Sequence, residues 1–249
     1  MPSTNDGINA ARTYRKLFAG KLTYFRVKKE QSDLAVGAHR LLDAEALEAL
    51  LRARECIEAE IARNPDFLTS FAPLAPVPGA AEPAGGMYAA AQAAHVGPMA
   101  AVAGAVAQYV GRALLRLSKE VIVENGGDIY IASETERLVA LYAGRSPLSM
   151  QVALKVPPGE WGVCTSAGRV GPSVSYGQAD AAVILSKDAP LADAAATALG
   201  NALKSECDIQ RALDFAMTIP GVLGAVAVMG DKLGASGQVE LAPYHNDKE

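Results

Sequence analysis

The sequence predicts an α+β fold, in which strands and helices occupy separate runs of the chain. Strand-like segments come first, helical segments follow and strand-like segments return, and this order occurs twice between residues 22 and 229. The chain is 50% hydrophobic but only 6% aromatic, and much of its apolar fraction is alanine, which favours closely packed helices. A polar pair, Gly126-Gly127, separates two apolar runs in the manner of a β-hairpin. Together these observations disfavour a doubly wound βαβ chain.

The first half of the pattern contains strands, a long helix and two alanine-rich helices. Apolar residues from Leu47 to Ile61 recur at helical spacing, Asp43 is the expected N-cap, and Asn64-Pro65 ends the helix. Gly104 and Gly111 share one face of the last helix and permit a close approach there. The predicted elements are strands at 22–27 and 33–36, a helix at 43–62, an extended proline-rich segment at 65–83, and two helices that meet at Gly97-Pro98.

The second half repeats this order with variations. Its predicted elements are strands at 148–156, 161–166 and 179–186, helices at 190–204 and 208–217, and a buried strand at 222–229. The repetition suggests an internal duplication, although the two halves show no clean sequence repeat.

Charge and cysteine usage exclude several classes of protein. The net charge is −4, and no basic cluster resembles a nucleic-acid footprint. The chain has 3 cysteines, which are widely spaced and form neither a disulfide framework nor a CxxC metal site. The uncharged stretch 84–111 is long enough to span a bilayer, but its Gln, His and Pro residues favour buried helices. We therefore expect a cytoplasmic protein that binds neither nucleic acid nor a membrane.

The most informative motif is Glu124-Asn125-Gly126-Gly127-Asp128. Two carboxylates and an amide crowd around two residues that have no side chain. The glycines would let a ligand approach the backbone, and the acids could hold a cation or a sugar hydroxyl. A tight turn with solvated acids explains the same residues, since Gly and Asp are common in turns.

A second motif is the pair Asp193 and Thr197, which are four residues apart on one helix face. A carboxylate and a hydroxyl are oxygen ligands of the kind that Mg²⁺ binds. The alternative is an acid favoured by the helix dipole and a threonine packed against its own helix.

A third segment, 164–177, is rich in hydroxyls and glycines and includes Thr165 and Ser166. Its backbone amides could wrap a phosphate, although a long hairpin loop explains the composition equally well. The P-loop and the Gly-x-Gly-x-x-Gly fingerprint are absent, and the sequence shows no recognisable pairing of a nucleophile with a base. His95, which precedes Gly97-Pro98, is more typical of a helix-end partner than of a catalyst.

Four motifs in this order closely resemble an uncharacterised bacterial and archaeal family of the ApbE-like superfamily. They are the segments 94–105 (AHVGPMAAVAGA), 123–129 (VENGGDI), 162–166 (GVCTS) and 192–198 (ADAAATA). Asn64-Pro65-Asp66-Phe67 matches as well, and the resemblance runs from about residue 14 to residue 241.

The resemblance implies a duplicated T-fold with antiparallel sheets packed against helices. It implies a single domain at 14–242, with halves at 14–135 and 148–242 and flexible tails at 1–13 and 243–249. The better understood relatives are flavin transferases that bind FAD, use Mg²⁺ and move FMN onto a protein threonine. Asp193 and Thr197 fall on the positions of their metal ligands. The implied cofactor-binding residues are Gly97, Glu124, Asn125, Gly126, Gly127, Asp128, Thr165 and Ser166.

The sequence also departs from those transferases. Gln108 stands where they carry a lysine, and the region from Ser166 to Asp180 contains no histidine to activate an acceptor threonine. The expectation is therefore a protein that binds FAD or a related phosphate-bearing nucleotide with Mg²⁺, and acts as a transferase or hydrolase other than a standard flavin transferase. The catalytic residues are unknown. A non-catalytic accessory protein of a cofactor or redox pathway is the alternative, and a homodimer is left open.

Overall fold

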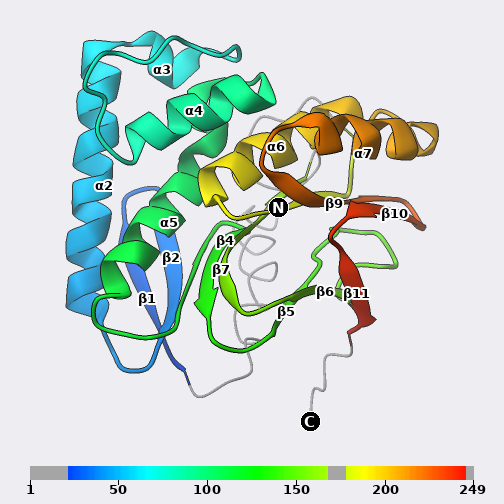
Figure 1. Ribbon diagram of the computed structural model, residues 1–249, viewed down its shortest axis with the longest axis horizontal. Coiled ribbons are helices and arrows are strands. Elements are labelled where there is room, and N and C mark those ends of the chain that lie inside the picture. The colour runs from blue at the N-terminus through cyan, green and yellow to red at the C-terminus, as the bar shows by residue number, and fades with distance from the viewer. Residues whose placement is uncertain (1–21, 168–177, 245–249) are drawn as a thin grey trace, which may run out of the picture.

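The computed structural model describes residues 22–167 and 178–244, and the predicted tail at 1–13, residues 245–249 and the segment 168–177 lie outside them. A large antiparallel sheet has the strand order β1-β2-β3-β4-β7-β8-β9-β10, and a smaller sheet has the order β11-β6-β5. Figure 1 shows helices above the large sheet and the small sheet below it. The strands are β1 Thr23–Lys29, β2 Ser32–Ala38, β3 Val121–Asn125, β4 Asp128–Ser133, β5 Arg137–Ala140, β6 Val152–Val156, β7 Gly159–Ser166, β8 Ala181–Ser186, β9 Val222–Met229, β10 Lys232–Gly237 and β11 Glu240–Pro243.

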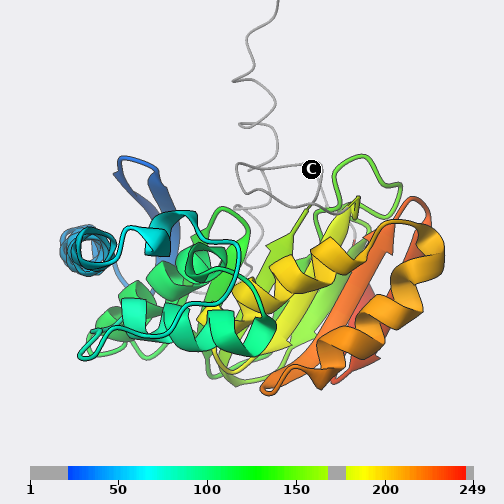
Figure 2. The ribbon, with the colours of Figure 1, turned by 90° about the horizontal axis from the view of Figure 1, so that it is seen from above.

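The helices lie along one side of the large sheet, as Figure 2 shows from above. They are α2 Asp43–Arg63, α3 Asp66–Thr69, α4 Ala84–Ala94, the 3₁₀ turn η2 Pro98–Ala101, α5 Val102–Leu114, α6 Ala189–Ala202, η3 Glu206–Asp208 and α7 Ile209–Thr218. Many of the buried residues in α4, α5 and α6 are alanines, which lets the helices approach the sheet and each other closely.

Two hydrophobic cores lie on the two faces of the large sheet. Along β4, Tyr130 and Ala132 belong to the core under the helices, while Ile129 and Ile131 belong to the core against the small sheet. Side chains alternate between the faces of a strand, so a strand buried on both faces is apolar at nearly every position. This explains the continuous apolar runs that the sequence shows here.

The α+β fold with antiparallel sheets packed against helices is confirmed. Each half of the large sheet has two strands, then helices, then two strands, which is the order expected from the sequence. The division into duplicated halves at 14–135 and 148–242 stays a prediction. Within the described ranges no single helix is long and apolar enough to cross a membrane, and α4 with η2 and α5 fits in length and composition only as a pair bent by 106°.

Several element boundaries differ from the prediction. Leu42, not Asp43, occupies the N-cap of α2, and Asp43 lies in the first turn, where its charge favours the helix dipole. The segment at 65–83 contains the short helix α3. The strand expected at 148–156 begins only at Val152, because the preceding residues form turns.

The Gly-Gly motif is a two-residue hairpin between β3 and β4. Asn125 and Asp128 are paired across the strands, so Gly126 and Gly127 alone make the turn. Their φ angles are 69° and 112°, and a positive φ at both central residues is what a type I′ turn requires. A Cβ atom at either glycine would meet no atom within 4 Å, which leaves the turn open on its outer side.

Candidate functional site

The candidate site lies where the N-terminal end of α5 meets α6. The backbone N–H of Gly104 donates a hydrogen bond to Oδ2 of Asp193 at 2.9 Å. A Cβ atom on Gly104 would lie 2.3 Å from the carbonyl oxygen of Ala189, the first residue of α6. Only glycine allows this contact, so the sequence at 104 fixes how closely the two helices approach.

Strand β7 supports the same helix from the sheet. A Cβ atom on Gly162 would lie 2.5 Å from Cα of Ala189. The neighbouring thiol of Cys164 is buried and donates to the carbonyl oxygen of Ala189 at 3.5 Å. Burial raises the pKa of this thiol well above its usual value, and the charges of Asp128 and Asp193 raise it further. Cys164 therefore acts as a neutral packing group and not as a nucleophile.

The β3–β4 hairpin brings further polar groups to this junction. Nδ2 of Asn125 donates to the carbonyl oxygen of Ala103, next to Gly104, at 3.2 Å. The N–H of Gly127 donates to Oε1 of the buried Glu124 at 2.8 Å. These bonds attach the hairpin to the beginning of α5 and fold the Glu124 side chain back under the turn.

Asp128 connects the hairpin to both β7 and α6. Its carboxylate is buried and accepts a hydrogen bond from the N–H of Thr165 at 3.2 Å. Burial raises its pKa well above the usual value, and the nearby charges of Asp193 and Glu124 contribute in the same direction. Within the described part of the chain, the neighbours that shift this pKa are acids, a thiol and a backbone amide, and none is a cation.

Asp193 is held in a similar environment. Desolvation raises the pKa of its carboxyl to about 7, although the backbone N–H groups of Gly104 and Ala103 act to lower it. A cation placed between Asp128 and Asp193 would compensate the desolvation of both charges. Without one, burial favours the protonated form of both carboxyl groups.

The donor atoms suit a hard cation. Thr197 lies one turn after Asp193 on α6 and is half-buried, so its hydroxyl lies on the same face as the carboxylate. Among the described residues, no group of three or more His, Cys, Asp or Glu side chains could hold a metal ion. Asp193 and Thr197 therefore fit Mg²⁺ only with additional oxygen ligands, such as phosphate or water.

The remaining predicted residues differ in their surroundings. Ser166 is buried at the end of β7, next to Thr165. A Cβ atom on Gly97 would lie 1.8 Å from the carbonyl oxygen of Ser70. Packing against the Ser70–Phe71 backbone accounts for this glycine. Its assignment to ligand binding stays a prediction.

The sequence reasoning did not include Asp188, which lies at the N-cap of α6. Its side chain accepts from the N–H of Leu191 at 3.3 Å, and it is joined to Gln108 of α5 at 2.8 Å. An aspartate two residues before Pro190, just ahead of an alanine-rich run, is a recognisable helix start. No pattern in the neighbouring sequence predicts the contact between Asp188 and Gln108.

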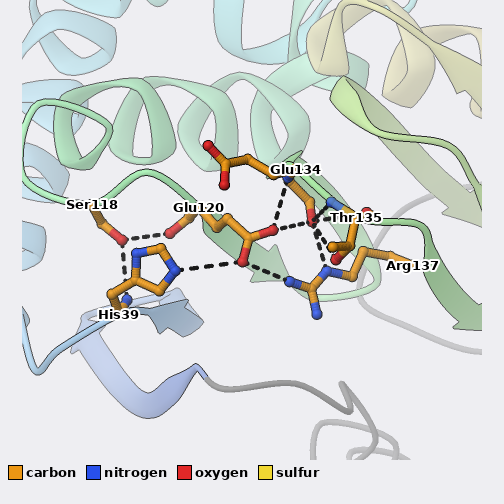
Figure 3. A network of polar contacts seen from close by, with 7 residues as sticks. His39, Ser118, Glu120, Glu134, Thr135 and Arg137 are labelled. Carbon is orange, nitrogen blue, oxygen red and sulfur yellow. Dashed lines mark hydrogen bonds and ion pairs between the residues drawn. The ribbon is translucent and has the colours of Figure 1, made fainter.

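A second polar network lies at the opposite end of β3 (Figure 3). Glu120 accepts from Oγ of Ser133 at 2.6 Å, from the N–H of Glu134 at 2.8 Å and from Nη2 of Arg137 at 3.0 Å. Burial acts to raise the pKa of Glu120, but these bonds outweigh it and lower the pKa to about 2.

This second network does not form a serine-histidine pair. The hydroxyl of Ser133 contacts Glu120, and Nε2 of His39 lies 3.5 Å from the other carboxylate oxygen of Glu120. The bonds connect β3 with the corner where the chain passes from β4 to β5. We interpret the network as structural.

Comparisons with known proteins place the chain in a family. A family model described as "AbpE bacteria" matches residues 15–238. A UPF0280 protein of Methanocella arvoryzae is 41% identical over 207 residues, which cover 82% of this chain and 84% of that protein. A UPF0280 protein of Methanothrix thermoacetophila is 37% identical over 220 residues, covering 87% and 92%.

Solved structures share the fold at low sequence identity. The ApbE protein from Thermotoga maritima has a TM-score of 0.55 at 14% identity and covers 86% of this chain and 97% of that one. The apo flavinyl transferase ApbE from Pseudomonas stutzeri has a TM-score of 0.53 at 16% identity, covering 89% and 95%. These likenesses show the fold alone. On the family model and the relatives together, the chain belongs to the ApbE-like family described as "AbpE bacteria".

Proposed function

We propose that this protein binds a flavin nucleotide, or a related phosphate-bearing nucleotide, together with Mg²⁺ at the junction of α5, α6 and the β3–β4 hairpin. The observation that carries the proposal is the approach of Asp128 and Asp193 at one partly buried junction. Two desolvated carboxylates are costly unless they hold protons or share a cation. The fold, which the solved flavinyl transferase ApbE from Pseudomonas stutzeri shares, supports a nucleotide as the ligand.

In this proposal each part of the junction has its own task. Asp193 and Thr197 hold Mg²⁺, which supplies the positive charge that the phosphate groups require. Asp128 shares the charge of this cation with Asp193, and Asn125 contacts the ribose or the base. The buried Glu124 holds the turn through the N–H of Gly127. The open outer side of Gly126-Gly127 leaves room for the ligand, and Thr165 and Ser166 contact phosphate.

The proposed chemistry is transfer or hydrolysis at a phosphate group, without transfer of FMN to a protein threonine. A threonine hydroxyl is a weak nucleophile that needs an adjacent base. The region 166–180 contains no histidine, and His39 belongs to the Glu120 network at the other end of β3.

Calorimetric titration with FAD, FMN and ADP, each with and without Mg²⁺, tests the proposal. We expect binding of at least one of these ligands to require Mg²⁺, and Asp193→Asn to remove the Mg²⁺ dependence while the variant stays folded. Mass spectrometry of small molecules that co-purify identifies a natural ligand. If wild-type protein binds none of the three with Mg²⁺ and carries no nucleotide, the proposal fails and the accessory role is favoured.

A further inference from the structure

Gln108 joins α5 to the beginning of α6 by two hydrogen bonds. Its Nε2 donates to Oδ1 of Asp188 at 2.8 Å, and its Oε1 accepts from the N–H of Ala189 at 2.8 Å. Gln108 lies one turn after Gly104 and is buried, so both residues face α6. Helix α5 therefore holds α6 at two points, at its N-cap and at Asp193.

The N-cap itself is held from the other side. The N–H of Asp188 donates to Oγ of Ser186 at 3.1 Å, and its Oδ2 accepts from the N–H of Leu191 at 3.3 Å. One carboxylate oxygen thus caps α6, while the other accepts from Gln108 of the neighbouring helix. These hydrogen bonds fix the position of the first turn of α6 relative to α5. Asp193 lies about one turn further along the same helix.

From this geometry we infer that Gln108 is a positioning residue, which sets the place of the Asp193 carboxylate by holding the N-terminus of α6. The inference rests on the proposed function insofar as Asp193 binds Mg²⁺. The position demands a side chain that donates to a carboxylate and accepts from an amide at the same time. A primary amide does both, whereas a carboxylate lacks the donor and an ammonium lacks the acceptor.

The consequence concerns metal affinity. If the hydrogen bonds of Gln108 to Asp188 and Ala189 are lost, the first turn of α6 is no longer fixed on α5. Asp193 then shifts relative to the N–H of Gly104. Loss of a residue that orients a metal ligand typically weakens metal binding about 10- to 100-fold.

An exchange of the two functional groups tests the inference. Gln108→Glu removes the donor, and Asp188→Asn leaves one oxygen to serve both Leu191 and Gln108. In the double variant Gln108→Glu/Asp188→Asn, the new amide at 188 donates to the new carboxylate at 108. That carboxylate still accepts from the N–H of Ala189, and the amide oxygen still caps α6. The net charge is unchanged and all of these bonds are restored.

The first readout is the affinity of Mg²⁺ in the presence of FAD, measured by calorimetry. We expect each single variant to bind Mg²⁺ at least about tenfold more weakly, and the double variant to return to within about threefold of wild type. The matched control is Gln92→Glu on α4, where Nε2 donates only to the carbonyl oxygen of Leu74 at 3.3 Å. This variant should bind as wild type does.

The second readout needs no ligand. The amide ¹H–¹⁵N signal of Gly104 reports its hydrogen bond to Asp193, so it should shift in each single variant and return in the double variant. If Gln108→Glu does not fold, Gln108→Met removes both bonds without adding a charge and takes its place. A merely structural glutamine would lower the melting temperature and leave the Gly104 signal unchanged.

The outcomes separate the two proposals. If wild type binds no Mg²⁺ with FAD but the Gly104 signal follows the exchange, the proposed function fails and the positioning role stands. If wild type binds Mg²⁺ but single variants change neither affinity nor signal, the positioning role is overturned. The positioning role is also overturned if the single variants lose Mg²⁺ binding and the double variant restores neither the Mg²⁺ affinity nor the Gly104 signal.

Discussion

The carboxylate of Asp193 on α6 accepts a hydrogen bond from the backbone N–H of Gly104 on α5 at 2.9 Å, across 89 residues of sequence. The bond exists because a glycine at 104 lets the backbones of the two helices touch. Asp193 is thereby presented beside Asp128 of the hairpin, whose pKa its charge helps to raise. Four predictions follow from these contacts and from the Glu120 network.

The stability of the metal-free protein should fall between about pH 4 and pH 7. The pKa of Asp193 is raised to about 7 in the fold, mainly by desolvation, whereas an unfolded aspartate ionises near 4. The folded state therefore holds a proton that the unfolded chain has released, and this contribution is lost as pH rises through the window. Urea unfolding at pH 5 and pH 8 should show the loss, and Asp193→Asn should reduce it. An unchanged pH dependence in the variant would contradict the prediction.

Gly104→Ala should destabilise the protein by about 1–3 kcal/mol, since overpacking forces neighbouring backbone to move. The new methyl group would lie 2.3 Å from a carbonyl oxygen of α6, and Mg²⁺-dependent binding should weaken as well. Gly86→Ala in α4 is the matched control, because its methyl group would meet only the end of the Glu82 side chain, at 3.0 Å. Thermal unfolding should give a lower melting temperature for Gly104→Ala than for Gly86→Ala. Equal melting temperatures would refute the close helix contact.

Gly127→Val should destabilise the protein through backbone strain, and weaker ligand binding should follow from that strain and not from a steric clash with the ligand. A side chain at this position meets no atom within 4 Å, but the φ of 112° is unfavourable for any residue with a Cβ atom. We expect a cost of about 1–3 kcal/mol together with weaker nucleotide binding. Gly126→Asn, at a φ of 69°, should be close to neutral because asparagine tolerates this region. Denaturant titrations of the two variants should therefore differ, and similar losses in both would argue against the turn geometry.

Arg137→Met should destabilise the protein by about 3–5 kcal/mol, because the Glu120 side chain, which is only 12% exposed, loses the buried guanidinium that pairs with its charge. The pKa of Glu120 is lowered to about 2 in the fold, so its contribution is present above the unfolded pKa of about 4.3 and is lost as pH falls toward 2. Adding Glu120→Gln should recover part of the loss at pH 7. Acid unfolding monitored by circular dichroism checks both statements; a double variant no more stable than Arg137→Met would contradict the ion-pair argument.

Much of the fold is determined by the sequence. The 3.6-residue spacing places α2, and the apolar runs on either side of Gly126-Gly127 place β3, β4 and their turn. Strands β5, β10 and β11 escaped prediction because β5 and β11 have only four residues each and β10 is interrupted by two glycines. They become strands only when a partner strand supplies the other half of the hydrogen bonds.

The candidate site shows the same division. Sequence alone singled out Asp128, Thr165 and Asp193 as members of three separate polar motifs. Only the tertiary structure determines that Asp128 accepts a hydrogen bond from Thr165 and that Gln108 donates one to Asp188. Local periodicity reports only which face of an element is buried, because it depends on neighbours within one or two turns. Which buried faces meet depends on the shapes of whole surfaces, here set by Gly104 and Gly162, and these shapes exist only after the chain has folded.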